Sequence, residues 1–260
     1  MRFITIVILS LVSEFCVAEK TSFTQYQSQY IKSISVVAPE WEGYTHKDGS
    51  GLYWDILRAI YEPSGIKVKT RIVPWNRALK MVSKYRTYNA IIGEYRDSEE
   101  NVIFPSFPID VEHLSLLSKK SYNHPWDGLH SLTNKRVGWI KGFELIVESK
   151  RDFKLKEFRD IEEGIKMLNA GKIDFIIDIS DEVMMASQTF KLSKEEYSIN
   201  EFPVIKDIYT AFSDDNLSRA LIEIYNQRIP KLVASGELAA IYEKWDTGVM
   251  PDMLKKLVQQ

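Results

Sequence analysis

Cysteine is nearly absent from this chain of 260 residues, since Cys16 is its only one. Internal repeats and low-complexity segments are absent as well. Lysine and arginine are spread along the chain, and the net charge is −2, which argues against a nucleic-acid-binding surface. With 45% hydrophobic and 27% charged residues, the composition is that of a globular protein of one large domain or two smaller lobes.

Long hydrophobic runs are also missing, apart from one at the beginning. Arg2 is followed by an apolar run from Phe3 to Val12, and small residues then lead to Ala18. This pattern predicts a secretory signal peptide, residues 1–18, and hence a periplasmic mature protein. A buried strand or a membrane anchor is the alternative, but a bilayer span needs about 20 apolar residues. Cleavage after Ala18 removes Cys16, and a chain without cysteine suits an oxidising compartment. Lipid attachment at Cys16 is disfavoured by the bulky Phe15 before it.

Motifs of several catalytic classes are missing too. The histidines have no spacing typical of zinc ligands, and no Gly-x-Ser-x-Gly turn occurs. The glycines at 49 and 51 lack the lysine of a phosphate-binding loop. We therefore predict that the protein is not an enzyme and has no catalytic residue, metal or cofactor.

What the sequence does contain is an alternation of strand and helix patterns, which indicates an α/β fold. A strand over 33–39 is followed by a helix led by Gly51, and by an alternating, one-face-charged strand over 66–73 that belongs at a sheet edge. A helix from Pro74 and a buried strand over 89–95 come next. In a later unit, Asp160 and Glu163 predict a capping box.

Six segments then resemble, in order, the periplasmic solute-binding proteins of the polar amino-acid type (family 3). They are "APEWEGYTHKDGSGLYWDIL", "VPWNRALKMV", "VIFPSFPI", "KRVGWIKGF", "AGKIDFIID" and "LVASGELAAIYEKW". The resemblance implies a type II periplasmic binding protein clamshell, with two α/β lobes joined by two crossing hinge strands. Lobe 1 would be 31–118 with 207–260, and lobe 2 would be 119–206. A small-molecule solute would be captured between the lobes by a monomer.

The same resemblance implies a partner at the membrane. Either an ABC permease accepts the solute, or a membrane sensor responds to the loaded protein. A dehydratase-like enzyme on the same fold is a third alternative, which the lack of an acid–base pair disfavours. The arginine with which relatives grip a carboxylate is not in its usual register, where Asn101 stands. The class of solute therefore stays open: it is either amino-acid-like or another molecule that bears a carboxylate.

Arg77 lies in the first turn of the helix predicted from Pro74. The partial positive charge of a helix N-terminus disfavours a cation there. Two interpretations are open: an ion pair with an acid such as Glu94, or an anion site formed by Arg77 and the helix end. Arg96 is the second cation that we consider for this role.

Other candidate ligand-binding residues follow from their positions. Trp41 and Tyr44 lie in the loop after the first strand, where aromatic side chains bind ligands or pack on a helix. Trp75 shares a helical face with core residues and could serve both purposes. The strand end at Glu94, Tyr95 and Arg96 is where ligands bind in α/β sheets, with a solvated turn as the alternative. By resemblance, the second lobe contributes Gly142, Phe143 and Asp178. Trp139 is expected in the core, and Asp174 is expected to be structural.

Overall fold

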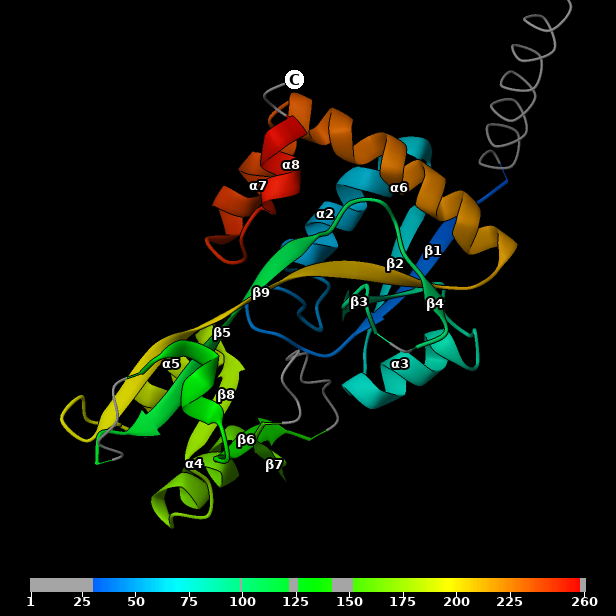
Figure 1. The fold of residues 1–260 in the computed structure, drawn as a ribbon. Coiled ribbons are helices and arrows are strands. Elements are labelled where there is room, and N and C mark those ends of the chain that lie inside the picture. Colours follow the sequence, from blue (N-terminus) through cyan, green and yellow to red (C-terminus); the bar gives the residue numbers. More distant parts are fainter. Residues whose placement is uncertain (1–29, 99, 122–125, 142–151, 258–260) are drawn as a thin grey trace, which may run out of the picture. The chain divides into compact units, whose positions relative to one another are not determined.

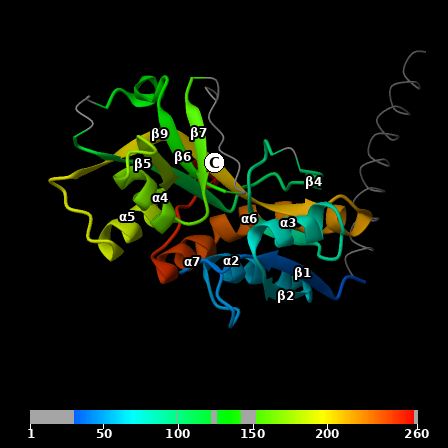
Figure 2. The ribbon, with the colours of Figure 1, turned by 90° about the horizontal axis from the view of Figure 1, so that it is seen from below.

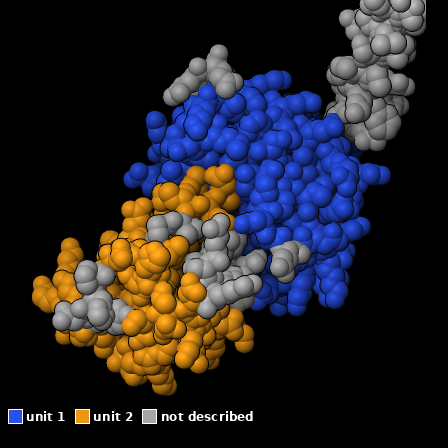
Figure 3. Space-filling model, in the orientation of Figure 1, with its two compact units in different colours: residues 1–110, 208–260 blue, residues 111–207 orange. Residues whose placement is uncertain are grey.

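The computed structural model describes residues 30–98, 100–121, 126–141 and 152–257. The predicted signal peptide lies outside these described residues. The chain divides into two compact units (Figure 3). Unit 1 takes the chain up to Asp110 and again from Ile208, and unit 2 spans Val111–Asp207. The predicted lobes change over after residues 118 and 206, whereas this division falls after 110 and 207.

Unit 1 is an α/β layer structure (Figure 1). Its strands have the order β2–β1–β3–β9, and β2, β1 and β3 are parallel, whereas β9 is antiparallel to β3 and also pairs with β4. Its elements are β1 (Ser33–Ala38), α2 (Leu52–Tyr61), η1 (Glu62–Ser64), β2 (Lys67–Ile72), α3 (Trp75–Ser83), β3 (Ala90–Glu94), β4 (Val102–Ile103), part of β9 (Tyr197–Ser213), α6 (Asn216–Ala234), α7 (Glu237–Trp245) and α8 (Asp252–Leu257).

The predicted edge strand is confirmed, because β2 is the first strand in the order. Val68 is buried, and Lys67, Lys69 and Arg71 are exposed. A strand alternates in this way when one of its faces packs on a core and the other meets water.

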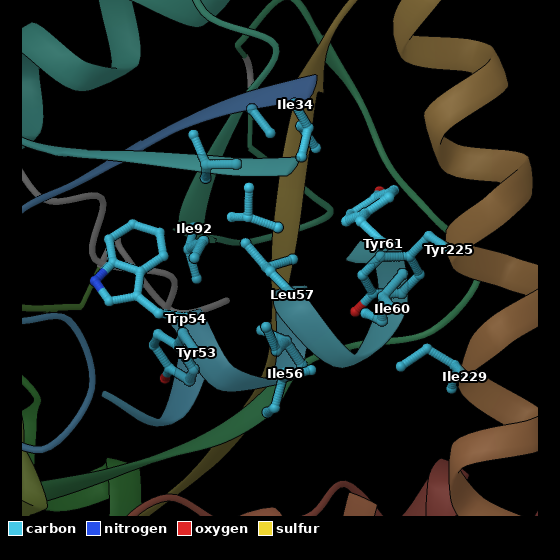
Figure 4. Packing of buried hydrophobic residues seen from close by; sticks show 14 of the residues in the cluster. Ile34, Tyr53, Trp54, Ile56, Leu57, Ile60, Tyr61, Ile92, Tyr225 and Ile229 are labelled. Carbon is cyan, nitrogen blue, oxygen red and sulfur yellow. The ribbon is translucent and has the colours of Figure 1, made fainter. Parts of the chain in front are cut away.

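The larger core of unit 1 lies between the sheet and helices α2 and α6 (Figure 4). Ile56 and Ile60 of α2 pack in this core with Ile229 of α6. The hydroxyl of Tyr61 donates a 3.1 Å hydrogen bond to the carbonyl of Leu221. Each fully buried aliphatic side chain stabilises the fold by about 1.5–3 kcal/mol, so α2 is held mainly by this apolar face.

The other face of the same sheet is covered by α3 (Figure 1). Ala78 and Val82 of the helix pack on Val37 of β1 and Ile91 of β3. Trp75 and Leu79 are partly buried against this cluster, which confirms the predicted apolar side of the helix.

The helix α6 departs from expectation at Pro230. A proline in a helix interior normally breaks or kinks the helix, but Pro230 lies inside α6, which continues to Ala234. The turn after the proline carries Leu232 and Val233, which are buried in the larger core. Their burial offsets the backbone hydrogen bond that proline cannot donate.

Unit 2 contains the sheet order β9–β5–β8–β6–β7. Helices α4 and α5 pack on one face, around Leu117 and Ile176 (Figure 2). The opposite face carries a cluster that includes Trp139, as predicted, together with Phe202. The elements are β5 (Asp110–Lys119), η2 (Gly128–Leu132), β6 (Arg136–Ile140), β7 (Lys154–Phe158), α4 (Ile161–Asn169), β8 (Phe175–Ile179), α5 (Ser180–Thr189) and the first part of β9.

Local polar contacts in unit 2 confirm one prediction and revise another. Asp174 is structural, because its carboxylate accepts hydrogen bonds from the Arg136 guanidinium at 2.6 and 3.0 Å. Asp160 caps α4 by accepting from the amide of Glu163 at 2.9 Å. The returning contact of the predicted capping box is different, since the Glu163 carboxylate accepts from the amide of Arg159 instead.

Candidate functional site

Most candidate residues of unit 1 lie at the carboxyl ends of its parallel strands. Trp41 follows β1, Trp75 begins α3 just after β2, and Glu94 ends β3. Parallel neighbouring strands end at the same edge of a sheet, and this is where open α/β sheets bind ligands.

Two tryptophans meet at this edge over a glycine. The rings of Trp41 and Trp75 have centroids 6.0 Å apart and planes inclined by 41°. Gly93 lies beneath them, and a Cβ atom there would come within 2.6 Å of Trp41 and 3.3 Å of Trp75. Gly93 also has a φ of 105°, which only glycine adopts readily. Both indoles are partly exposed, so part of their aromatic surface meets solvent while their inner edges pack on the core.

Tyr44 has a different setting from Trp41. Its ring lies 4.9 Å from that of Tyr53, and its hydroxyl accepts a hydrogen bond from the amide of Gly248 at 3.1 Å. These contacts favour the interpretation that Tyr44 packs within unit 1. Of the two aromatic residues in this loop, Trp41 is the one that contacts another candidate residue, Trp75.

Arg77 is exposed on α3, two residues after Trp75. Its amide bonds to the carbonyl of Pro74 at 2.9 Å, as in a first helical turn. The guanidinium makes no hydrogen bond or ion pair with any residue in the described ranges. An ion pair between Arg77 and Glu94 is therefore not found in the described ranges, and the anion site at Arg77 stays a prediction.

Arg96 is held within unit 1. Its guanidinium carbon lies 4.5 Å from the centre of the Tyr209 ring, and one of its nitrogens donates to the carbonyl of Pro105. Phe104 packs edge-on against the same tyrosine. A planar cation held between an aromatic face and a carbonyl has a structural role even where it also contacts a ligand.

Glu94 is the last residue of β3, and Tyr95 follows it at the same edge of the sheet. Glu94 is only 5% exposed, and its carboxylate accepts a hydrogen bond from the amide of Tyr95 at 3.0 Å. Tyr95 is partly buried against the larger core. The solvated turn considered for this segment does not fit Glu94.

Asp178 is the candidate of unit 2. It lies in β8 opposite Ser115, two residues before α5 begins, and it is 4% exposed. Its carboxylate accepts a 2.9 Å hydrogen bond from the amide of Ile179. Burial, and then the charges of Glu182 and Glu112, raise the pKa of Asp178 from 3.8 to about 7, although the hydrogen bond from Ile179 acts in the opposite direction. Among the described residues, no cation forms an ion pair with it.

Sequence reasoning missed Glu182 and Gly93. Glu182 lies four residues after Asp178 in the first turn of α5, and burial raises its pKa as well. An acid near a helix start at that spacing was the available signal. Gly93 had a signal too, as a glycine within a buried strand often marks close approach of another group. The predicted residues Gly142 and Phe143 lie outside the described residues.

Metal-binding groupings are not found in the described ranges. Within 30–257, apart from the gaps, no cluster of three histidine, cysteine or acidic residues could hold a metal ion. The same stretches contain no helix of the length and apolarity required to cross a bilayer.

The sequence matches one protein-family model over most of its length. Residues 35–248 match the model for bacterial extracellular solute-binding proteins, family 3. No curated protein sequence matches the chain.

Solved structures show the same fold at low sequence identity. A mutant of ArgBP from T. maritima has 16% identity and a TM-score of 0.61, covering 82% of this chain and 95% of its own. A substrate-binding protein of an ABC uptake transporter from Streptococcus pneumoniae, with bound histidine, has 19% identity and a TM-score of 0.61, covering 85% and 95%. A histidine kinase sensor domain similar to periplasmic binding proteins has 16% identity and a TM-score of 0.64, covering 85% and 99%.

Proposed function

The chain belongs to family 3 of the bacterial extracellular solute-binding proteins, and from this premise we propose that it captures a small polar solute bearing an ammonium group for delivery to an ABC-type importer. The family is one of ligand-binding proteins rather than enzymes, and it implies a transporter or receptor at the membrane.

The proposal that the solute bears an ammonium group rests on the burial of the Asp178 carboxylate. A buried carboxylate without a cation is costly in its charged form, which is why its pKa rises. A ligand ammonium placed against it would restore the ionised form and form a charge-assisted hydrogen bond. Glu182 adds negative charge nearby and favours the same ligand chemistry.

Unit 1 offers complementary chemistry. The Trp41–Trp75 pair suits an apolar or planar part of a solute by stacking and area. Arg77, at the start of α3, suits an anionic group such as a carboxylate. Amino-acid-like solutes carry each of these groups, and the similar structures include an ancestral arginine-binding protein bound to arginine and the Streptococcus pneumoniae protein with bound histidine.

Sensing is the second candidate function. A sensor domain of a histidine kinase shares the fold over 85% of this chain, so the same solute could be reported to a receptor instead of an importer. Deletion of the partner genes separates the two: loss of solute uptake favours import, and loss of a transcriptional response with uptake intact favours sensing.

A thermal-shift screen of the purified protein tests the proposal directly. Amino acids, amines, small carboxylates and oligosaccharides are compared as ligands. A solute at 100 times its Kd should stabilise the protein by about 2.7 kcal/mol. Stabilisation by amino acids or amines, and its loss in Asp178→Asn, supports the proposal. Stabilisation only by oligosaccharides or by carboxylates without an amine contradicts it.

A further inference from the structure

One stretch of unit 1 contains cations and no acids. Residues 63–93 contain seven lysines and arginines and neither aspartate nor glutamate. The whole chain has 34 basic and 36 acidic residues, so the remainder has 34 − 7 = 27 basic residues against 36 acids, a net charge of −9. Such an asymmetry within one chain indicates an oppositely charged partner.

The fold gathers these cations on one side of the sheet. In the pairing of β1 with β2, Arg71 lies opposite Val37, whose side chain packs under α3. Lys69 and Lys67 are two and four residues before Arg71, so they project from that same face. The hydroxyl of Tyr88, which follows α3, accepts a 3.1 Å hydrogen bond from Arg71.

The outer side of α3 continues the charge. Lys80 and Lys84 are exposed there, and Arg86 is exposed in the turn that follows. Helix α3 packs on the sheet next to β1, the neighbour of β2 (Figure 2). We define the basic face as the six exposed cations other than Arg77, namely Lys67, Lys69, Arg71, Lys80, Lys84 and Arg86.

None of the six forms an ion pair with any residue that the structure describes. Some cations elsewhere in unit 1 do form ion pairs: Lys47 pairs with Glu40, and Arg58 and Lys244 both pair with Asp55. The basic face is therefore a surface whose charge is not neutralised within the described chain.

The residue types of the basic face indicate which class of partner it suits. Four of the six cations are lysines, which are depleted in the cores of protein–protein interfaces. Between residues 63 and 93, Tyr85 is the only large hydrophobic residue that is well exposed, at 59%. Lysines around an exposed tyrosine are instead typical of surfaces that meet lipid headgroups, where the ring rests at the interface.

We propose that the basic face binds the anionic headgroups of a lipid bilayer, so that the protein is held electrostatically at the membrane surface. The inference does not rest on the identity of the solute. Each lysine or arginine near an anionic bilayer contributes favourably, and the attraction extends over about one Debye length, roughly 10 Å at 0.1 M salt.

Vesicle co-sedimentation of the full chain tests the inference. Vesicles of equal parts phosphatidylglycerol and phosphatidylcholine are compared with vesicles of phosphatidylcholine alone, at low and high salt. The triple variant Lys69→Glu, Lys80→Glu, Lys84→Glu is compared with a control, Lys154→Glu, Lys156→Glu, Lys194→Glu. The control lysines are exposed in unit 2 and also make no ion pair with a described residue. Both variants move the net charge from −2 to −8, since each of three changes lowers it by two.

We expect the wild type to bind only the anionic vesicles, and to be released by high salt. The basic-face variant should bind them at least about 100-fold more weakly, and the control should lose far less. Equal losses in the two variants would reduce the effect to net charge and overturn the inference. Absence of vesicle binding by the wild type would overturn it too, and if the basic-face variant then also impaired solute uptake, the partner would be an acidic protein. Solute affinity should be unchanged in the basic-face variant, which keeps this test separate from that of the proposed function.

Discussion

The hydroxyl of Tyr53 donates a 2.7 Å hydrogen bond to the carboxylate of Asp110, and both side chains are buried. The second oxygen of Asp110 accepts from the amide of Val249 at 2.7 Å. One carboxylate thus connects helix α2, the first residue of β5 and the segment between α7 and α8. Burial, and then the charge of Asp110, raise the pKa of Tyr53 well above its ordinary value, so the hydroxyl keeps its proton and donates.

Tyr53→Phe should lower the free energy of unfolding by about 1–3 kcal/mol, because it leaves a buried carboxylate oxygen without its donor. Urea unfolding measures the change. Tyr85→Phe, at a residue 59% exposed, is the matched control and should stay within about 0.5 kcal/mol. Equal stability of Tyr53→Phe and wild type would show that water replaces the tyrosine donor.

Gly93→Ala should disturb the tryptophan pair. The new methyl group would lie 2.6 Å from Trp41 on a backbone with φ of 105°, so the indole must move. We expect a loss of stability of about 1–3 kcal/mol from the backbone strain, and a changed near-ultraviolet circular dichroism spectrum. Gly65→Ala is the control, since it has a φ of 74° and no atom within 4 Å of the new methyl group. A spectrum that changes equally in both variants would contradict the predicted contact.

Asp178→Asn should alter how stability depends on pH. Folded Asp178 keeps its proton up to about pH 7, whereas in the unfolded chain it releases it near 3.8. The folded state therefore binds more protons between these values, and the contribution of Asp178 to stability falls as the pH rises from about 4 to 7. The variant should match the wild type near pH 4 and exceed its unfolding free energy by about 1–4 kcal/mol at pH 8.

The exposed carboxylate of Asp152 provides the control for this series, as Asp152→Asn in the same unit should leave the pH profile of the wild type in place. In the wild type, an ammonium-bearing solute should bind about tenfold more tightly at pH 8 than at pH 6, because it requires the ionised form of Asp178. Affinity that is independent of pH would place the ammonium group elsewhere.

Arg77→Ala should weaken binding of an anion-bearing solute roughly 10- to 150-fold, since a charge-assisted hydrogen bond contributes about 1.5–3 kcal/mol. Arg77→Lys should recover only part, because lysine cannot form the planar fork of arginine. Calorimetry on folded variants measures the affinity, with Lys80→Ala, one turn along the same exposed side of α3, as the control.

Arg96→Ala belongs in the same series. Unchanged affinity in Arg77→Ala with strong loss in Arg96→Ala would move the anion site to Arg96. Because Arg96 also stacks on Tyr209, its variant must first be shown to retain its stability. Unchanged affinity in both variants would mean a solute without an anionic group.

Local features of the fold could be predicted from the sequence because neighbouring residues determine them. The alternation of Lys67, Val68 and Lys69 specified an edge strand, and the apolar spacing of Trp75, Leu79 and Val82 specified the buried side of α3. The cap at Asp160 needed only the residue three positions later. In each case the interaction lies within a few residues, so the pattern alone contains the information.

Tertiary structure decided what depends on residues far apart in the chain. Pro230 does not end α6, because burial of the turn after it stabilises the helix. Arg77 and Arg96 are equivalent cations in the sequence, but only Arg96 stacks on the ring of Tyr209. These two residues are 209 − 96 = 113 positions apart in the chain. The sequence shows that residues 63–93 contain basic and no acidic residues, but only the register of β2 against β1 shows that three of these cations lie on the side of the sheet on which α3 packs. A side chain's partner is set by which segments pack together, and that depends on the whole core rather than on local sequence.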